Sequence, residues 1–265
     1  MEKGFLKNME SAVNWIGLET SSIMPLLETT TRTLPLQREI KKALENGSRF
    51  KVDRYSITEA KQQILTSYEN ALRSFERAKQ PAERRGIQDQ TKLTNIFIKA
   101  LAENWYGREE TLRWSDASLE ICSDGATFFS ELESNLNKKR ECYLQILRED
   151  VSTLVIKASE IKSYWVSPEF ETDLVVEVEV MENEKSLHSF FEMFQPIANS
   201  LYREKVTIND AIDLFHLFSL YHTGKIREIW SCNQNFVKRH DNYLRSLNDE
   251  HFSVLFKNTK IRRIK

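Results

Sequence analysis

The longest regular pattern in the chain covers residues 56–79. Its apolar side chains recur every three or four positions, which places them on one face of an α-helix. Ser56 and Glu59 match the capping box that begins a helix, and Pro81 is expected to end it because proline has no N–H to donate. At 1.5 Å per residue the helix would be roughly 36 Å long, a rod along which other helices can pack. The residues on its apolar face are Ile57, Ala60, Ile64, Leu65, Tyr68, Ala71, Leu72, Phe75 and Ala78.

The first 150 residues repeat this helical spacing several times. Gly17 and Gly47 stand where two of the patterns stop, as glycine does at helix ends. The polar residues 49–55 are expected to be a connector into the long helix. We therefore predict a helical bundle or a helical array over residues 1–150. Its further helices are expected at residues 5–16, 33–46, 93–105 and 128–147.

The pattern changes near residue 151, where two segments alternate between apolar and polar side chains. Residues 153–158 and 174–181 have the period of two that is typical of half-buried, antiparallel strands. Residues 252–256 are a candidate for a third strand. The fold class that we expect is mainly α, in which a C-terminal α+β region at residues 151–265 carries a small antiparallel β element and packs with the N-terminal part as one unit. Helices are expected in this region at residues 187–201, 207–221 and 226–247.

Composition excludes several classes of protein. The chain has seven glycines and neither the G-x-G-x-x-G nor the P-loop motif, so no recognisable nucleotide-binding turn is present. Its three cysteines show no C-x-x-C spacing, which argues against a zinc knuckle or a disulfide framework. No apolar run approaches the length of a membrane span, and the N-terminal segment lacks the unbroken apolar core of a signal peptide. We expect a cytoplasmic protein without a cofactor.

Few residues form a catalytic pattern. Arg245 and His251 fit the R-x(4–6)-H spacing of the metal-independent HEPN ribonucleases, although chance supplies about one such match in a chain of this composition. The acidic side chains of residues 173–179 are expected to form a solvated strand face rather than a metal site. His216 and His222 lie too far apart around a helix to share a metal ion, so we interpret His216 as a core histidine and His222 as a helix-end residue.

Two groups of basic residues are candidate contacts for an anion or a nucleic acid. The first lies at the end of the long helix and the second in the C-terminal tail. The simpler interpretation of the first group is stabilisation of the helix end and ion pairing with Glu69 and Glu76. The net charge of −1 gives the chain no basic excess as a whole. The two groups are Arg73, Arg77, Lys79, Arg84 and Arg85, and Lys260, Arg262 and Arg263.

These observations favour a non-catalytic protein. We expect an interaction, scaffold or adaptor protein that presents long amphipathic helices to a protein partner or to a second copy of itself in an oligomer. An exposed aromatic patch near Trp105, Trp114 or Trp165 would support this function. No catalytic signature rises above chance, which argues against an enzyme. The alternatives are a HEPN-like ribonuclease that uses Arg245 and His251, and an accessory protein that binds nucleic acid or a membrane surface through the basic groups.

Overall fold

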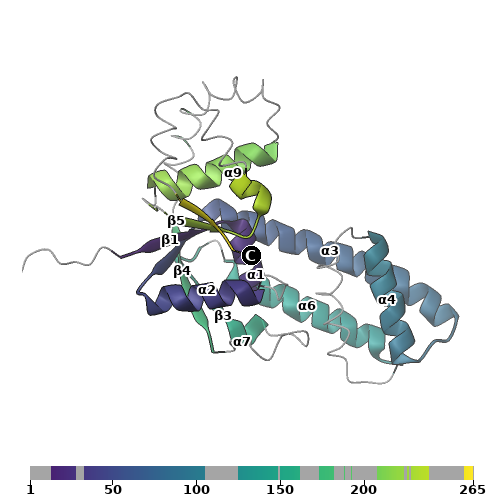
Figure 1. Cartoon of the computed structure of the whole chain (residues 1–265). Coiled ribbons are helices and arrows are strands. Elements are labelled where there is room, and N and C mark those ends of the chain that lie inside the picture. Colours follow the sequence, from purple (N-terminus) through teal and green to yellow (C-terminus); the bar gives the residue numbers. More distant parts are fainter. Residues whose placement is uncertain are drawn as a thin grey trace, which may run out of the picture.

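The computed structural model describes residues 13–27, 33–104, 125–148, 150–161, 173–181, 188, 192, 208–223, 226, 228–238 and 260–264. Within these residues a six-stranded sheet is covered by helices, and a group of long helices extends to one side of it (Figure 1). The strands are β1 (Trp15–Leu18), β2 (Arg49–Asp53), β3 (Thr153–Lys157), β4 (Val175–Met181), β5 (Glu228–Ser231) and β6 (Lys260–Arg263). The helices are α1 (Thr20–Leu27), α2 (Thr33–Glu45), α3 (Arg54–Arg84), α4 (Gln90–Asn104), α6 (Phe128–Ile146), α7 (Ala158–Ile161) and α9 (Ile208–Phe218), which is continued by the π-helix η1 (Ser219–Thr223).

The order of the strands across the sheet is β3-β4-β2-β1-β5-β6. β3 pairs antiparallel with β4, and all other neighbouring strands are parallel. Strands β2, β3 and β4, which follow β1 in the chain, all lie on one side of it, whereas the last two strands, β5 and β6, lie on the other side. The strand order therefore reverses at β1. In open α/β sheets, ligands bind outside the carboxyl ends of the strands at such a reversal.

The expectation of a mainly helical chain with some β structure is confirmed. The expected small antiparallel element is wrong, because the sheet has six strands and most of its pairs are parallel. The antiparallel pair of residues 153–157 and 175–181 is confirmed, but it forms only one edge of the sheet. The division at residue 150 stays a prediction, and strands from both sides of that residue join in the one sheet.

Two predictions are wrong at strands β1 and β2. Residues 15–18 form β1 rather than the end of a helix, and residues 49–53 form β2 rather than a connector. Gly17 therefore lies inside a strand, where a Cβ would stand only 3.2 Å from Cγ1 of Ile229, so glycine allows this side chain of β5 to pack closely against β1. In β2 only a few residues alternate between exposed and buried positions. Segments this short have too little periodicity to outweigh a helical pattern beside them.

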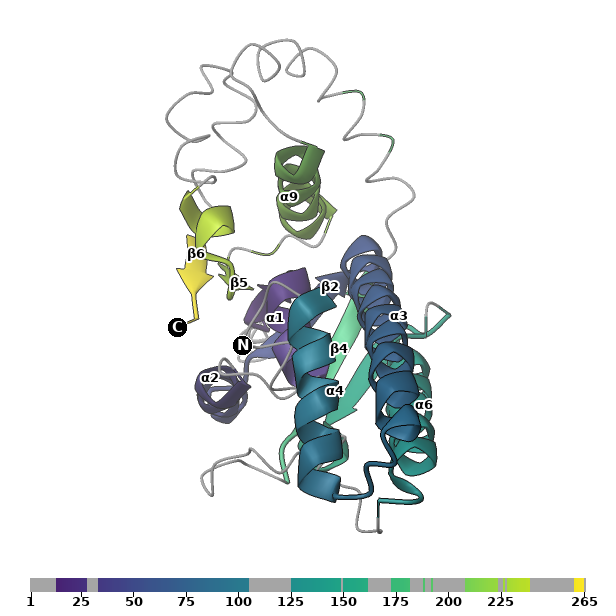
Figure 2. The same cartoon turned by 90° about the vertical axis from the view of Figure 1, so that its right-hand side faces the viewer.

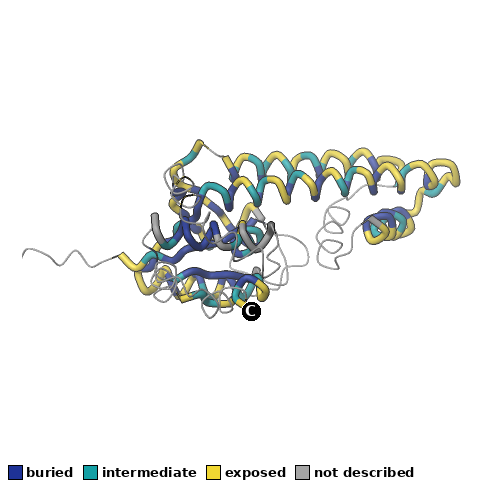
Figure 3. Tube along the Cα trace, turned by 90° about the horizontal axis from the view of Figure 1, so that it is seen from above, coloured by how far each residue is buried: buried dark blue, intermediate teal, exposed yellow. Residues whose placement is uncertain are grey.

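The core lies mainly on the face of the sheet that carries Phe50 and Trp230. These two rings meet edge to face with centroids 5.7 Å apart, and both side chains are almost completely buried. Apolar residues of α1, α2 and α3 belong to the same buried cluster. Figure 3 shows buried positions along the strands and alternating buried and exposed positions along the long helices, as expected for amphipathic helices.

Helix α3 confirms the long helix expected at residues 56–79 and continues beyond it. Pro81 was expected to end the helix, but it lies within the last turns. The buried side chain of Ala82 packs this part of the helix against the core. The helix ends just before Gly86, whose φ of 57° suits glycine at a helix end.

Helices α3, α4 and α6 form an arm that extends from the sheet (Figures 1 and 3). The ring of Tyr68 contacts that of Tyr143 with centroids 6.4 Å apart, and Phe75 contacts Phe129 with centroids 5.6 Å apart. These contacts join α3 to α6 along the arm. α3 begins beside the sheet, and its last turns lie at the far end of the arm (Figure 1).

The C-terminal region differs from the expected series of helices. Residues 228–231 form β5, because pairing with β1 buries the apolar side chains of this segment, so the helix expected at 226–247 is wrong there. The helix expected at 207–221 is confirmed as α9 and η1. Across the described parts of the chain, no helix is both long and apolar enough to cross a membrane. The candidate strand 252–256 and most of the expected helix 187–201 lie outside the described residues.

Candidate functional site

Polar residues stand at the carboxyl ends of the three central strands. Glu19 follows β1, Asp53 is the last residue of β2, and Ser231 is the last residue of β5. The register pairs the last residue of β1 with Val52 and with Trp230, so the next residues of the three strands stand at the same level across the sheet. Glu19 therefore lies between Asp53 and Ser231, at the place where the strand order reverses.

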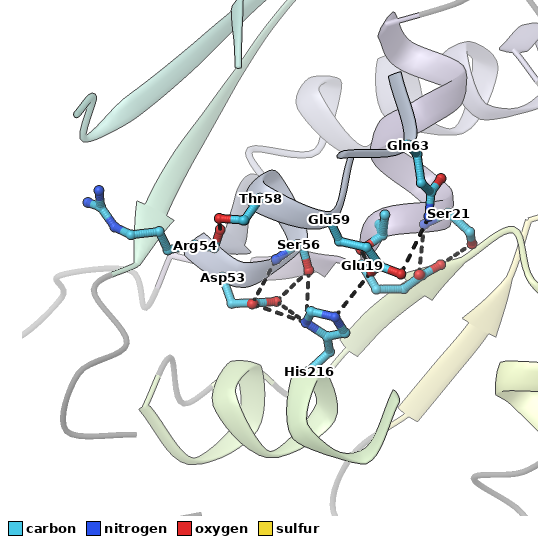
Figure 4. A network of polar contacts seen from close by, with 10 residues as sticks. Glu19, Ser21, Asp53, Arg54, Ser56, Thr58, Glu59, Gln63 and His216 are labelled. Carbon is cyan, nitrogen blue, oxygen red and sulfur yellow. Dashed lines mark hydrogen bonds and ion pairs between the residues drawn. The ribbon is translucent and has the colours of Figure 1, made fainter. Parts of the chain in front are cut away.

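His216 of α9 binds Asp53 at this edge (Figure 4). Nδ1 of His216 lies 3.0 Å from Oδ2 and 3.1 Å from Oδ1 of Asp53, and 3.1 Å from the hydroxyl oxygen of Ser56. Asp53 also caps α3, because its carboxylate accepts hydrogen bonds from the backbone N–H and the hydroxyl of Ser56 at 3.0 and 2.5 Å. The cap of this helix is thus Asp53 and not the expected Ser56. All three side chains are buried.

Glu59 lies on α3 just after its first turn and faces the same histidine. Nε2 of His216 is 3.3 Å from Oε2 of Glu59, an ion-pair distance without the geometry of a hydrogen bond. The hydroxyl of Thr20 donates to the same oxygen at 2.5 Å, and Nε2 of Gln63 lies 3.4 Å from the other oxygen. The side chain of Glu59 is 39% exposed, whereas that of His216 is 3% exposed. Glu59 is therefore the carboxylate through which solvent reaches the cluster.

Glu19 is held by the turn that follows it. The backbone N–H of Ser21 donates to its carboxylate at 2.7 Å, and the hydroxyl of Ser21 donates to the same group. The hydroxyl oxygen of Ser21 in turn accepts a hydrogen bond from the backbone N–H of Cys232 at 3.0 Å and lies 3.5 Å from the hydroxyl oxygen of Ser231. These contacts connect the end of β1 to the end of β5 and fix Glu19 between them.

Asp53 and Glu59 contact the imidazole of His216, and Glu19 interacts with it only through its charge. Burial alone would lower the pKa of His216, but the carboxylates of Asp53 and Glu59 outweigh burial and raise this pKa to about 10. Burial opposes the ionisation of Asp53 and Glu59, yet their contacts with His216 and with neighbouring hydroxyls hold both pKa values below the usual range. Burial raises the pKa of Glu19 to about 6, against the hydrogen bonds from Ser21. At neutral pH three negative charges therefore face one imidazolium.

This excess of negative charge determines what the site can bind. Buried charges are costly unless they are paired, so the cluster favours a cation. In the part of the chain that the structure describes, no three His, Cys, Asp or Glu side chains form a ready-made metal site.

The free energy of unfolding is expected to fall as the pH rises from about 5 to about 10. The pKa of His216 is higher in the folded protein than the usual 6.5, so its contribution is complete below pH 6.5 and is lost as the pH rises through about 10. The raised pKa of Glu19 adds to the decline between about pH 4.5 and 6. The lowered pKa of Asp53 acts in the opposite sense, because its contribution is present above the usual 3.8 and is lost at lower pH.

Urea denaturation at about pH 5, 7 and 9 measures this change. The variant His216→Gln is the control, because it keeps a polar side chain but has no charge to lose. Its stability is expected to change less than that of the wild type above about pH 6.5. An equal decline in both proteins would show that His216 is not the group responsible.

Two interpretations from the sequence are confirmed at this site and beside it. His216 is buried, as expected of a core histidine, but it also binds two carboxylates. Glu177 and Glu179 are exposed on β4, as expected of a solvated strand face. Several other residues that the sequence singled out lie outside the described residues, namely Arg245, His251, Trp105, Trp114 and Trp165.

The two basic groups lie apart from each other. Figures 1 and 2 show β6 at the edge of the sheet, away from the far end of the arm. Arg262 of β6 pairs with Glu39 and lies over the ring of Trp230 at 5.3 Å from its centroid, so it contributes to packing. Lys260 and Arg263 are exposed on the same strand. In the distal half of α3, Arg73, Arg77 and Arg84 are exposed, as is Arg85 just after the helix, and Lys79 is partly exposed.

Glu19, Asp53 and Glu59 were not found as site residues from the sequence. An acidic residue stands at the end of each of these short strands, Glu19 just after β1 and Asp53 as the last residue of β2, and this signal can be recognised only when β1 and β2 are known to be strands. Glu59 was assigned to a capping box because its spacing from Ser56 fits one. The tertiary structure gives it a different partner, His216, which lies on α9 near the other end of the chain.

Comparison of the chain with models of protein families, with curated proteins and with solved structures gave no match. We therefore infer a function from the geometry and the charges of the site.

Proposed function

We propose that the protein is a divalent-cation-dependent hydrolase that cleaves phosphodiester bonds. The observation that supports this proposal is the excess negative charge of the cluster, in which Glu19 and Asp53 at the carboxyl ends of parallel strands and Glu59 on α3 stand against the single positive charge of His216. Mg²⁺ is usually held by one or two carboxylates, and water and substrate phosphate oxygens complete its coordination. A cation here would offset the buried charge and would bring a phosphate group to the same edge of the sheet.

Glu19 and Glu59 are the two carboxylates available to such a cation. Glu59 is partly exposed, so a hydrated cation can reach it from solvent. Asp53 is less suitable, because both of its oxygens already face the imidazolium of His216, whereas the oxygens of Glu19 accept hydrogen bonds from the uncharged N–H and hydroxyl of Ser21. Two carboxylates are enough for Mg²⁺, because water and substrate oxygens complete its coordination.

The chain positions these carboxylates before any ligand binds. Thr20 and His216 both contact the oxygen of Glu59 that faces the cluster, and Ser21 fixes Glu19. A bound cation polarises the phosphate and lowers the pKa of water, so it supplies the activation that hydrolysis needs. Water attacks phosphorus, the bond to the leaving oxygen breaks, and the products are a phosphate monoester and an alcohol.

The test is hydrolysis of a 5′-fluorescein-labelled oligonucleotide by the purified full chain with Mg²⁺, with Mn²⁺ and with EDTA. We expect shortened products with either cation, no products with EDTA, and recovery when excess cation is added. Calorimetric titration of the protein with Mn²⁺ alone is expected to show saturable binding. Cleavage that persists in EDTA, or no cleavage with any cation, would overturn the proposal. Persistence in EDTA is the result that a metal-independent, HEPN-like ribonuclease would give.

The scaffold function expected from the sequence stays a second proposal. The arm of α3, α4 and α6 favours it, because it extends beyond the sheet and offers exposed helix faces to a partner (Figure 1). Light scattering of the protein from its native host, combined with mass spectrometry of co-purifying material, tests this function. A stoichiometric protein partner together with no cation-dependent hydrolysis would favour the scaffold over the hydrolase.

A further inference from the structure

Helix α3 joins the candidate site to the far end of the arm by one continuous surface. Glu59 lies in the site, and the residues in line with it along the helix can be found from the rotation of about 100° per residue. Those within about 40° of its direction form what we call the α3 row. The α3 row consists of Gln63, Thr66, Asn70, Arg73, Arg77, Pro81 and Arg84. All of them are exposed except Asn70, which is partly exposed.

The chemistry of the α3 row changes with distance from the site. Gln63, whose amide lies 3.4 Å from the Glu59 carboxylate, begins a neutral part that can form hydrogen bonds. Arginines follow at Arg73, Arg77 and Arg84, roughly 21, 27 and 38 Å along the helix axis from Glu59. The row is thus neutral beside the acidic cluster and cationic further away, and no carboxylate of α3 beyond Glu59 belongs to it.

The α3 row is narrow. Glu69, Glu76 and Glu83 are exposed on α3 at about 80–120° to one side of it, and Glu69 lies 4.0 Å from Arg73. A flat anionic membrane surface would meet these glutamates together with the arginines, so the two charges would largely cancel. A single polyanionic strand can follow the arginines alone. Charge complementarity therefore favours a strand over a membrane.

We propose that a single-stranded nucleic acid binds along the α3 row, with one phosphodiester at the carboxylate cluster and more distant phosphates on Arg73, Arg77 and Arg84. The inference rests on the proposed function, since it names the substrate class of the same site. The arginines are roughly 6 and 10 Å apart along the axis. A stacked strand advances about 3.4 Å per nucleotide, so the arginines meet every second or third phosphate. The residues of the α3 row near the site, Gln63, Thr66 and Asn70, are neutral and do not hold a phosphate in place, so the strand can shift towards the cation.

The test is binding of 5′-fluorescein-labelled 12-nucleotide oligo(U) and oligo(dT), measured by fluorescence anisotropy in EDTA so that no hydrolysis occurs. The variant Arg73→Gln/Arg77→Gln/Arg84→Gln is expected to weaken binding at least tenfold at low salt. It is also expected to reduce the slope of log K against log salt by about 2, since each phosphate contact on a single strand contributes about 0.7. RNA and DNA strands are compared because the α3 row contacts phosphates and not bases.

A matched control removes the same charge elsewhere on the arm. Lys138→Gln/Lys139→Gln/Arg140→Gln on α6 is expected to bind the 12-nucleotide strand within about twofold of the wild type, because it leaves the α3 row intact. Circular dichroism and melting temperature establish that both variants are folded. Equal loss of binding in the two variants would overturn the proposal, because it would show only a general attraction. No binding by the wild type would overturn it as well.

The outcomes also separate this inference from the proposed hydrolysis. A 4-nucleotide substrate is too short to reach from Glu59 to Arg73, so its hydrolysis should not depend on the arginines. Binding of the 12-nucleotide strand that requires the arginines, without hydrolysis, would support the α3 row and contradict the hydrolase. Hydrolysis of the 4-nucleotide substrate, together with binding of the 12-nucleotide strand that does not depend on the arginines, would support the hydrolase and contradict the α3 row. Arginine-dependent binding to phosphatidylserine vesicles and not to either strand would overturn the inference.

Discussion

Glu59→Gln is expected to lower kcat/KM for hydrolysis of the oligonucleotide at least about 100-fold. Loss of a group that only orients a metal ligand lowers activity about 10- to 100-fold, so loss of a ligand should lower it by at least the upper value. Glutamine keeps the size of the side chain, and its amide oxygen can still accept the hydrogen bond from Thr20. The change therefore removes the charge and leaves the packing. Rates with Mg²⁺ and calorimetric titration with Mn²⁺ measure the effect on activity and on cation affinity.

Glu19→Gln provides an independent check of the same prediction. Burial raises the pKa of Glu19 to about 6, so ionising this carboxyl at higher pH lowers the stability of the folded protein. A neutral glutamine avoids that penalty. We therefore expect the activity to fall by a similar factor while the melting temperature at about pH 8 stays the same or rises. A residue with a purely structural role would not combine these two results.

The control for both variants is Glu45→Gln at the exposed end of α2. It removes one carboxylate outside the cluster and should leave the rate within about twofold of the wild type. Full activity of Glu59→Gln and Glu19→Gln with normal cation dependence would contradict the assignment of the two ligands. A parallel loss of activity and of folded structure in both would show that the carboxylates only support the fold.

Asp53→Ala is expected to lower the free energy of unfolding by about 3–5 kcal/mol. The change leaves His216 buried without the carboxylate that its Nδ1 binds, and it also removes the cap of α3. A buried charge without a partner is strongly destabilising, whereas a lost cap costs about 1 kcal/mol. The imidazolium then keeps only Glu59, which is partly exposed, as its ion-pair partner, and this loss of pairing is the larger effect. Urea denaturation at about pH 7 measures the loss.

Two further variants separate the charge from the cap. Asparagine can cap a helix, so Asp53→Asn keeps the cap and removes only the charge, and it provides a measurement if the alanine variant does not fold. The double variant Asp53→Ala/His216→Leu removes both partners, and it should be less destabilised than the sum of the two single variants. A loss below about 1 kcal/mol in Asp53→Ala, or strict additivity in the double variant, would show that the pair does not act as a buried ion pair.

The elements that the sequence predicted well are those whose contacts are local. α3 was found from its apolar spacing, because each side chain on its buried face has neighbours three and four residues away in the same segment. The strands β3 and β4 were found because one face of each is exposed, so polar and apolar residues alternate. The burial of His216 followed from the apolar character of α9.

The tertiary structure decided the sheet and the candidate site. β1 and β2 are short, and they are strands because each pairs with a neighbour that is distant in the chain. Parallel strands need such distant partners, so no local pattern identifies them reliably. Glu19, Asp53 and His216 come from three separate elements and meet only when the carboxyl ends of β1 and β2 align beneath α9. The sequence alone therefore determined the helices and the half-exposed strands, and long-range pairing determined where the charges meet.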